Sequence, residues 1–246
     1  ENLETRRIAG LFLAGQIMVM AVSPDGNELA YVLHDDQGDR LIRRNLKDQQ
    51  EVVLLQRQRQ IQQLAWSPDS RELAFDHWQE EGLDLNDEIW IINRDGKEER
   101  KVADGFSPVW SPDGRFLAYG TPLPDRPPEE TDNRLEIVDR LGKERRVIFD
   151  AALQKTPPTP SPGGVGSPYY SPSLHVHPVD WSSDGNKILF ALNGNTVAMY
   201  QIELASGEIT DLRVSGEAMV EGQFIKRTNQ VLAYSYGGKG WFALSI

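Results

Sequence analysis

The stretch "LAWSPDSRELAF" at residues 64–75 returns as "PVWSPDGRFLAY" at residues 108–119, which places Ser67 and Ser111 44 residues apart. In both copies a Ser-Pro-Asp turn separates two apolar segments. Proline presets the first corner of a type I turn, Asp suits the second, and a following Gly allows the two strands to pair. We therefore interpret the stretch as a β-hairpin that the chain repeats at a fixed interval.

The hairpin turn occurs four times and its second strand five times. The turns are "VSPDG" at 22–26, "WSPDS" at 66–70, "WSPDG" at 110–114 and "WSSDG" at 181–185. The strands that follow end at Tyr31, Phe75, Tyr119, Phe190 and Tyr234, at intervals of 44, 44, 71 and 44 residues. Because 71 is 44 plus 27, the spacing indicates five units and one insertion of 27 residues.

Each unit holds four strands, which unit two shows clearly. Its entering strand is followed by "RELAFDH", "EIWIIN" and "EERKVAD". Four antiparallel strands repeated every 40 to 50 residues are typical of a β-propeller. The sequence predicts an all-β, five-bladed β-propeller of four-stranded antiparallel blades. The blade units are about 14–57, 58–104, 105–150, 176–215 and 216–246 together with 4–11, with the insertion at about 151–175.

These repeats resemble those of TolB-like β-propellers, whose hallmark is W-S-P-D-G followed by a short apolar strand. The resemblance covers nearly the whole chain, and related repeats occur in tricorn-type and prolyl-oligopeptidase-type propellers. The chain departs from TolB in having five countable units where TolB has six blades, and in lacking the N-terminal α/β domain of that family. The resemblance implies a periplasmic or otherwise extracytoplasmic protein with a partner in an envelope assembly.

The last unit ends after three strands, so its outermost strand must come from elsewhere. The stretch "ETRRIAG" at 4–10 matches the outer strands "EERKVAD" and "KERRVIF" of units two and three. We expect residues 6–11 to add the fourth strand to the blade that holds Trp241, which would close the ring and cover a free sheet edge.

Strand parity separates short connections from long ones. In a four-stranded antiparallel blade, the turns after the first and third strands lie at one end, and these are short throughout. The other end receives three expected loops, at 76–88, at 120–134 and within the insertion at about 150–177. Because loops on a rigid scaffold commonly carry binding residues, we expect the functional face there.

Acidic and aromatic side chains mark that face as a candidate partner surface. Its negative charge either forms a solvated rim or guides a basic partner in a salt-dependent way. The tyrosine pair, flanked by Ser-Pro on each side, either anchors a partner or packs onto the propeller. The candidate residues are Trp78, Glu80, Glu81, Asp84, Asp125, Glu129, Glu130, Tyr169, Tyr170, His175 and His177.

Two histidines open the expected inner strand of unit four. His175 and His177 alternate, so both should point the same way near the channel mouth, whereas Asp180 stands at odd spacing and should face the opposite side. Such a set does not make a metal site with Asp180. We expect both histidines to line the channel, with no metal and no cofactor.

Composition narrows the function further. The net charge is −11, from 37 acidic and 26 basic residues, which disfavours nucleic-acid binding. There is no cysteine, which excludes thiol chemistry and disulfides, and no apolar run long enough to insert into a membrane. The chain starts at Glu1, so it is expected to be a processed or trimmed product.

No sequence signature of an enzyme is present. The chain has no G-x-S-x-G or H-E-x-x-H, and "PGGVG" at 162–166 lacks the lysine of a phosphate loop. The sequence therefore favours a non-catalytic, monomeric interaction scaffold that presents one acidic, loop-bearing face to a protein partner. The alternative is a glycan-binding or glycoside-hydrolysing propeller, which would need carboxylates on the inner strands.

Overall fold

The fold was analysed in a computed structural model, which describes residues 16–58, 61–81, 84–122, 133–151, 175–193, 197–212, 219–225, 228, 230–235 and 240–245. These residues form nineteen strands. The strands are β1 (Gln16–Val22), β2 (Glu28–Asp35), β3 (Gly38–Asn45), β4 (Glu51–Arg57), β5 (Ile61–Trp66), β6 (Glu72–Glu81), β7 (Asp84–Asn93), β8 (Arg100–Asp104), β9 (Phe106–Trp110), β10 (Phe116–Pro122), β11 (Asn133–Asp139), β12 (Arg145–Asp150), β13 (His175–Trp181), β14 (Lys187–Asn193), β15 (Val197–Glu203), β16 (Ile209–Asp211), β17 (Met219–Phe224), β18 (Gln230–Ser235) and β19 (Gly240–Ser245).

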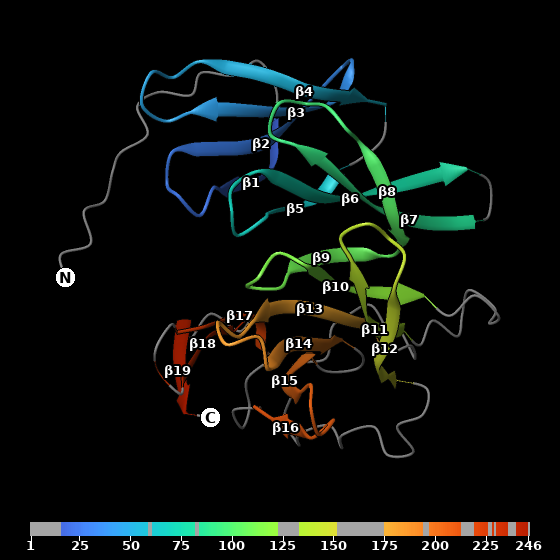
Figure 1. The fold of residues 1–246 in the computed structure, drawn as a ribbon, viewed down its shortest axis with the longest axis vertical. Helices are drawn as coiled ribbons and strands as arrows, with labels where there is room; N and C mark the ends of the chain where they lie inside the picture. Colours follow the sequence, from blue (N-terminus) through green and yellow to red (C-terminus); the bar gives the residue numbers. More distant parts are fainter. Residues whose placement is uncertain are drawn as a thin grey trace.

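The strands form five antiparallel meanders. Four sheets have four strands each, and β17-β18-β19 has three among the described residues. The sheets follow one another in chain order, from β1–β4 to β17–β19, with β1, β5, β9, β13 and β17 as their innermost strands (Figure 1). The prediction of a five-bladed β-propeller is confirmed. The expected fourth strand of the last blade, residues 6–11, lies outside the described residues, as does most of the insertion.

Each hairpin turn is held by its own polar side chains. In the first copy, the Ser23 hydroxyl donates to Asp25 Oδ1 at 2.6 Å and accepts from the Glu28 amide at 2.9 Å. Gly26 takes φ of +72°, the left-handed conformation that glycine adopts without strain. Ser70 occupies the same position in the second copy at φ of +58°. The repeated motif is therefore a turn device, as predicted.

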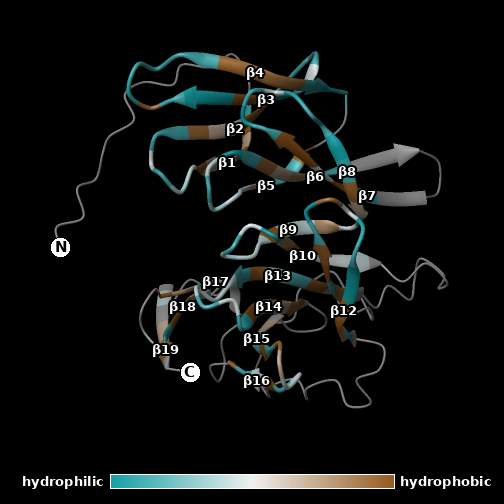
Figure 2. Ribbon diagram, in the orientation of Figure 1, coloured by the Kyte–Doolittle hydropathy of each residue, from teal (hydrophilic) through white to brown (hydrophobic). Residues whose placement is uncertain are grey.

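The core lies between neighbouring sheets, because a single blade cannot bury either face alone. The repeated aromatic residues Tyr31, Phe75, Tyr119 and Phe190 are fully buried. The apolar stretches, coloured brown, lie within the strands, whereas the turns between strands are mainly hydrophilic (Figure 2). The fifth unit departs from this pattern: Val231 pairs with Phe224, which puts Ala233 at the buried aromatic position and turns Tyr234 to the other face.

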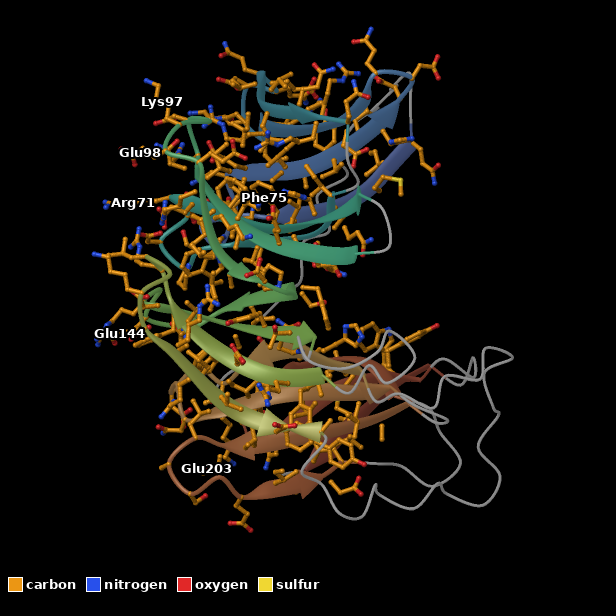
Figure 3. All side chains as sticks on the ribbon, turned by 90° about the vertical axis from the view of Figure 1, so that its right-hand side faces the viewer. Arg71, Phe75, Lys97, Glu98, Glu144 and Glu203 are labelled. Atoms are coloured by element: carbon orange, nitrogen blue, oxygen red, sulfur yellow. The ribbon has the colours of Figure 1, made fainter. Side chains whose placement is uncertain are left out.

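One end of the blades carries short turns and the other carries longer connections, as the order of the strands predicts, with one correction. The turns that carry Arg71, Lys97, Glu98 and Glu144 gather at one side of the molecule, the short-turn end (Figure 3). At the opposite, long-loop end, β10 ends at Pro122, β11 begins at Asn133 and β13 begins at His175. The expected loop at 76–88 is wrong: β6 and β7 continue as a hairpin of ten residues each, because Trp78 pairs with Asp87 and Glu81 with Asp84.

Candidate functional site: the axial channel and its long-loop end

A cavity of about 940 Å³ lies between the inner strands of the blades. Its wall mixes polar and apolar surface and includes the three motif tryptophans and several prolines. Its polar side chains stand on four different inner strands. They are Gln63, Ser107, His177, Asp180 and Gln223, and Ser183 of the turn after β13 adds a further hydroxyl.

A β-bulge in every inner strand decides which side chains face this channel. In β13 the register shifts between Pro178 and Asp180, so His177 pairs with Ala191 and Asp180 with Leu189. Residues 189 and 191 share one face of their strand, and therefore His177 and Asp180 do too. The expectation that Asp180 faces the opposite side is wrong, because the extra residue of the bulge reverses the alternation.

Two aspartates in this region, Asp76 buried and Asp180 partly buried, connect one blade to the next. Asp76 accepts from the amides of Gln63 at 2.8 Å and Ser107 at 2.7 Å, and so ties its own blade to β9. Asp180 does the same for β17, accepting from the Phe224 amide at 2.8 Å and from Trp181 at 2.8 Å. These carboxylates satisfy backbone donors of the inner strands.

Asp39 makes the equivalent connection at the first junction. Its Oδ2 accepts from the Ile61 amide at 2.7 Å, and its Oδ1 lies 2.6 Å from His34 Nδ1. Three blade junctions thus use an aspartate on one sheet and an inner-strand amide on the next. The sequence analysis missed this role, because the aspartates stand on β3, β6 and β13 and share no motif.

His177 is the predicted site residue whose surroundings are best described. Its ring lies 5.0 Å from the Phe106 ring, centroid to centroid, and its Nδ1 lies 3.4 Å from Ser107 Oγ. Ser107 belongs to the bulge of β9 and has φ of +56°, a strained value for serine. His177 lines the channel cavity.

Asp87 is a carboxyl with a perturbed pKa at the long-loop end. Burial, followed by the negative charge of Asp76, raises the pKa of Asp87 to about 6. Burial also raises the pKa of Asp76. Asp87 lies on β7, within the hairpin that the sequence analysis treated as a loop. A carboxyl with this pKa holds a proton over part of the neutral range.

The other predicted site residues are placed only in part. Trp78, Glu80, Glu81 and Asp84 lie in the β6–β7 hairpin, and His175 begins β13, but their side chains lie outside the described set. Asp125, Glu129, Glu130, Tyr169 and Tyr170 lie outside the described residues altogether. Within the described ranges, no cluster of three or more His, Asp or Glu could hold a metal, and no helix could span a membrane.

Comparison with solved structures places this architecture among known propellers. The TolB of Agrobacterium tumefaciens superposes with a TM-score of 0.65 at 16% identity, covering 91% of this chain and 71% of that one. The TolB of Acinetobacter baumannii gives 0.57 at 15% identity, covering 94% of this chain and 54% of that one. The fold is a TolB-like β-propeller.

The same fold occurs in an enzyme. The oligogalacturonate lyase of Vibrio parahaemolyticus superposes with a TM-score of 0.64 at 16% identity, covering 94% of this chain and 66% of that one. By sequence, the chain matches no protein-family profile and no curated protein. At such identities the likeness concerns the fold, and function has to be argued from the site.

Proposed function

We propose that this protein is a non-catalytic interaction scaffold that presents its long-loop end to a protein partner, as part of an extracytoplasmic assembly. The observation that carries the proposal is the use of two carboxylates, Asp180 in the channel wall and Asp76 behind it. Asp76 and Asp180 each accept two backbone hydrogen bonds and join neighbouring blades. Carboxylates that hold the scaffold together in this way are poorly placed to act as acid and nucleophile.

The asymmetry of the two ends supports the same interpretation. The short-turn end consists of hairpins closed by their own serine and aspartate side chains, as at Ser67 and Asp69, 2.6 Å apart. The long-loop end combines the β6–β7 hairpin with the connection that follows Pro122 and the one that precedes His175. Sequence variation in such connections changes a binding surface without disturbing the blades. The extracytoplasmic assignment rests on the TolB-like fold alone.

Charge reversal at the two ends tests the proposal. The variant Glu80→Lys/Glu81→Lys reverses the charge of the β6–β7 hairpin at the long-loop end. The variant Glu98→Lys/Glu208→Lys makes the same change in charge at the short-turn end and is the matched control. We expect the intact chain to capture a partner from an envelope extract at low salt, the first variant to lose it and the control to keep it. Capture of nothing, or equal capture by both variants, would remove the basis of the proposal.

A carbohydrate-directed function is the second candidate. The pKa of about 6 at Asp87 favours it, since a proton-holding carboxyl near a channel suits acid–base chemistry, and the fold recurs in an oligogalacturonate lyase. Incubating the protein with an oligogalacturonate and with neutral oligosaccharides tests this directly. Cleavage that Asp87→Asn abolishes would replace the scaffold proposal with an enzymatic one.

A further inference from the structure

The first two blade junctions are sealed at the short-turn end by the same ionic arrangement. Glu28, almost fully buried, accepts from Arg43 of its own blade and Arg94 of the next, both at 2.7 Å. Each carboxylate of this kind stands at the start of a second strand, directly after the hairpin turn.

The second junction repeats the arrangement around Glu72. This buried carboxylate accepts from Arg100 of its own blade at 2.8 Å and from Arg140 of the next blade at 2.6 Å. The arginine of the following blade comes in both cases from the turn between its third and fourth strands. A buried Glu with one arginine from each blade therefore seals the first two junctions.

The third junction keeps the geometry but has lost the carboxylate. Phe116 stands where Glu72 stands in the preceding blade, directly after the turn. Leu204 stands where Arg140 stands: the amide of Leu204 bonds the carbonyl of Asn186 at 2.8 Å, just as the amide of Arg140 bonds that of Arg115 at 2.9 Å. Phe116 and Leu204 pack into one apolar cluster across the junction.

One arginine of the seal remains at this junction. Arg146 pairs with Ile137 as Arg100 pairs with Ile91, so it occupies the position from which Arg100 reaches Glu72. Among the described residues, Arg146 forms no ion pair. Its neighbour Arg145 also lines this region, but its guanidinium donates to the carbonyl of Val102 in the preceding blade at 3.3 Å.

The tryptophan of this junction is also rearranged. The indoles of Trp66 and Trp110 each donate to a carbonyl of the preceding blade, Ala21 and Ala65, at 3.0 Å. The indole of Trp181 instead donates to Gly185 in its own turn, at 3.1 Å. The equivalent carbonyl of the preceding blade, that of Val109, does not receive this bond.

These changes leave a cleft of about 790 Å³ between blades three and four. Phe116, Ile137, Leu204 and Trp181 supply its apolar surface, and Arg146 lines it. Asp184 also lines it, but its Oδ1 accepts from the Ser182 hydroxyl at 2.7 Å and the Asn186 amide at 3.0 Å. Asp113 is held in its turn in the same way, and Glu144 is exposed at the rim.

We propose that this cleft binds a peptide segment of a partner protein that carries an acidic side chain beside a bulky apolar one. The acidic side chain supplies the carboxylate that Glu28 and Glu72 supply internally at the first two junctions. It binds Arg146, whose planar guanidinium suits two parallel hydrogen bonds to a carboxylate. The apolar side chain packs on Phe116, Leu204 and Trp181. The cleft lies at the opposite end from the face assigned to the partner above, so the two proposals are independent.

The test uses three acetylated peptides titrated into the ¹⁵N-labelled full chain. The first, acetyl-Gly-Phe-Asp-Leu-Gly-amide, carries the acidic side chain; the second replaces Asp with Asn; the third is the Asn peptide with a free terminal carboxylate. The readout is the indole signal of Trp181, assigned by its loss in Trp181→Phe. We expect a saturable shift with the Asp peptide and affinity at least about tenfold weaker for the Asn peptide.

Variants locate the binding in the cleft. Arg146→Gln should lower the affinity for the Asp peptide by about tenfold or more. Glu144→Gln removes only a charge at the rim of the cleft and should preserve or raise that affinity. Phe116→Glu restores the internal carboxylate and should abolish binding.

Three results would overturn the proposal. They are no shift up to about 5 mM Asp peptide, an affinity that Arg146→Gln leaves unchanged, and equal binding of the Asn and Asp peptides. Binding of the free-terminus peptide alone would replace it with recognition of a chain end.

Discussion

The variant Glu72→Gln tests whether the ionic seal between blades two and three stabilises the propeller. Glutamine keeps the shape of the side chain, so the change removes charge and little else. The Glu72 side chain is 8% exposed, and its two arginine partners are 26% and 42% exposed. A hydrogen bond to a charged group contributes about 1 kcal/mol more than a neutral one, so two such bonds predict a loss of about 2 kcal/mol.

Urea and thermal unfolding measure this loss. For a chain of this size, 2 kcal/mol corresponds to a fall in melting temperature of roughly 4–8 °C. The control Glu208→Gln, an exposed carboxylate at the same end, should stay within about 0.5 kcal/mol of the parent. The double variant Glu72→Phe/Arg140→Leu copies the third junction and should recover part of the loss. A change within 0.5 kcal/mol for Glu72→Gln would refute the reasoning.

Four further changes have defined outcomes. Trp66→Phe removes one indole bond between blades and should cost about 1 kcal/mol in urea unfolding. Asp180→Ala leaves the Phe224 amide without its acceptor, so we expect a loss of about 1–3 kcal/mol and faster hydrogen exchange at that amide. The folded-state pKa of Asp87 is raised, so ionising this group weakens folding as the pH rises from about 4 through 6. Asp87→Asn should therefore be about 1–2 kcal/mol more stable than the parent at pH 7, after allowance for solvent screening, and equal to it near pH 4. Deleting residues 4–11 should lower the melting temperature if they form the expected strand beside β19, and an unchanged value would contradict that strand.

The repeated turn predicts the architecture because its chemistry is local. Ser-Pro-Asp-Gly closes a hairpin with its own atoms, so each copy marks one blade wherever it occurs. Where the motif is lost, the prediction weakens: in the fifth unit the aromatic alignment places Tyr234 one residue away from the buried position, which Ala233 occupies.

The site could be predicted less well, because it depends on which face of an inner strand each side chain occupies and on contacts between blades. The bulge in β13 reverses the alternation of side chains after Pro178, and no residue pattern in "HVHPVDW" predicts this bulge. The loop expected at 76–88 contains charged residues, but a hairpin that projects from the sheet tolerates them as well as a loop does. The ionic seals did leave a signal, since Glu28 and Glu72 hold equivalent positions in two copies and Phe116 replaces them in the third.

The central claim is that a protein partner binds at the long-loop end. Affinity capture by the intact chain beside a chain lacking residues 154–174, each at low and high salt, with mass spectrometry of what is bound, tests it most directly. The account predicts a partner that is lost on deletion and weakened by salt. Equal capture by both chains at both salt concentrations would contradict it and place the binding surface elsewhere on the propeller.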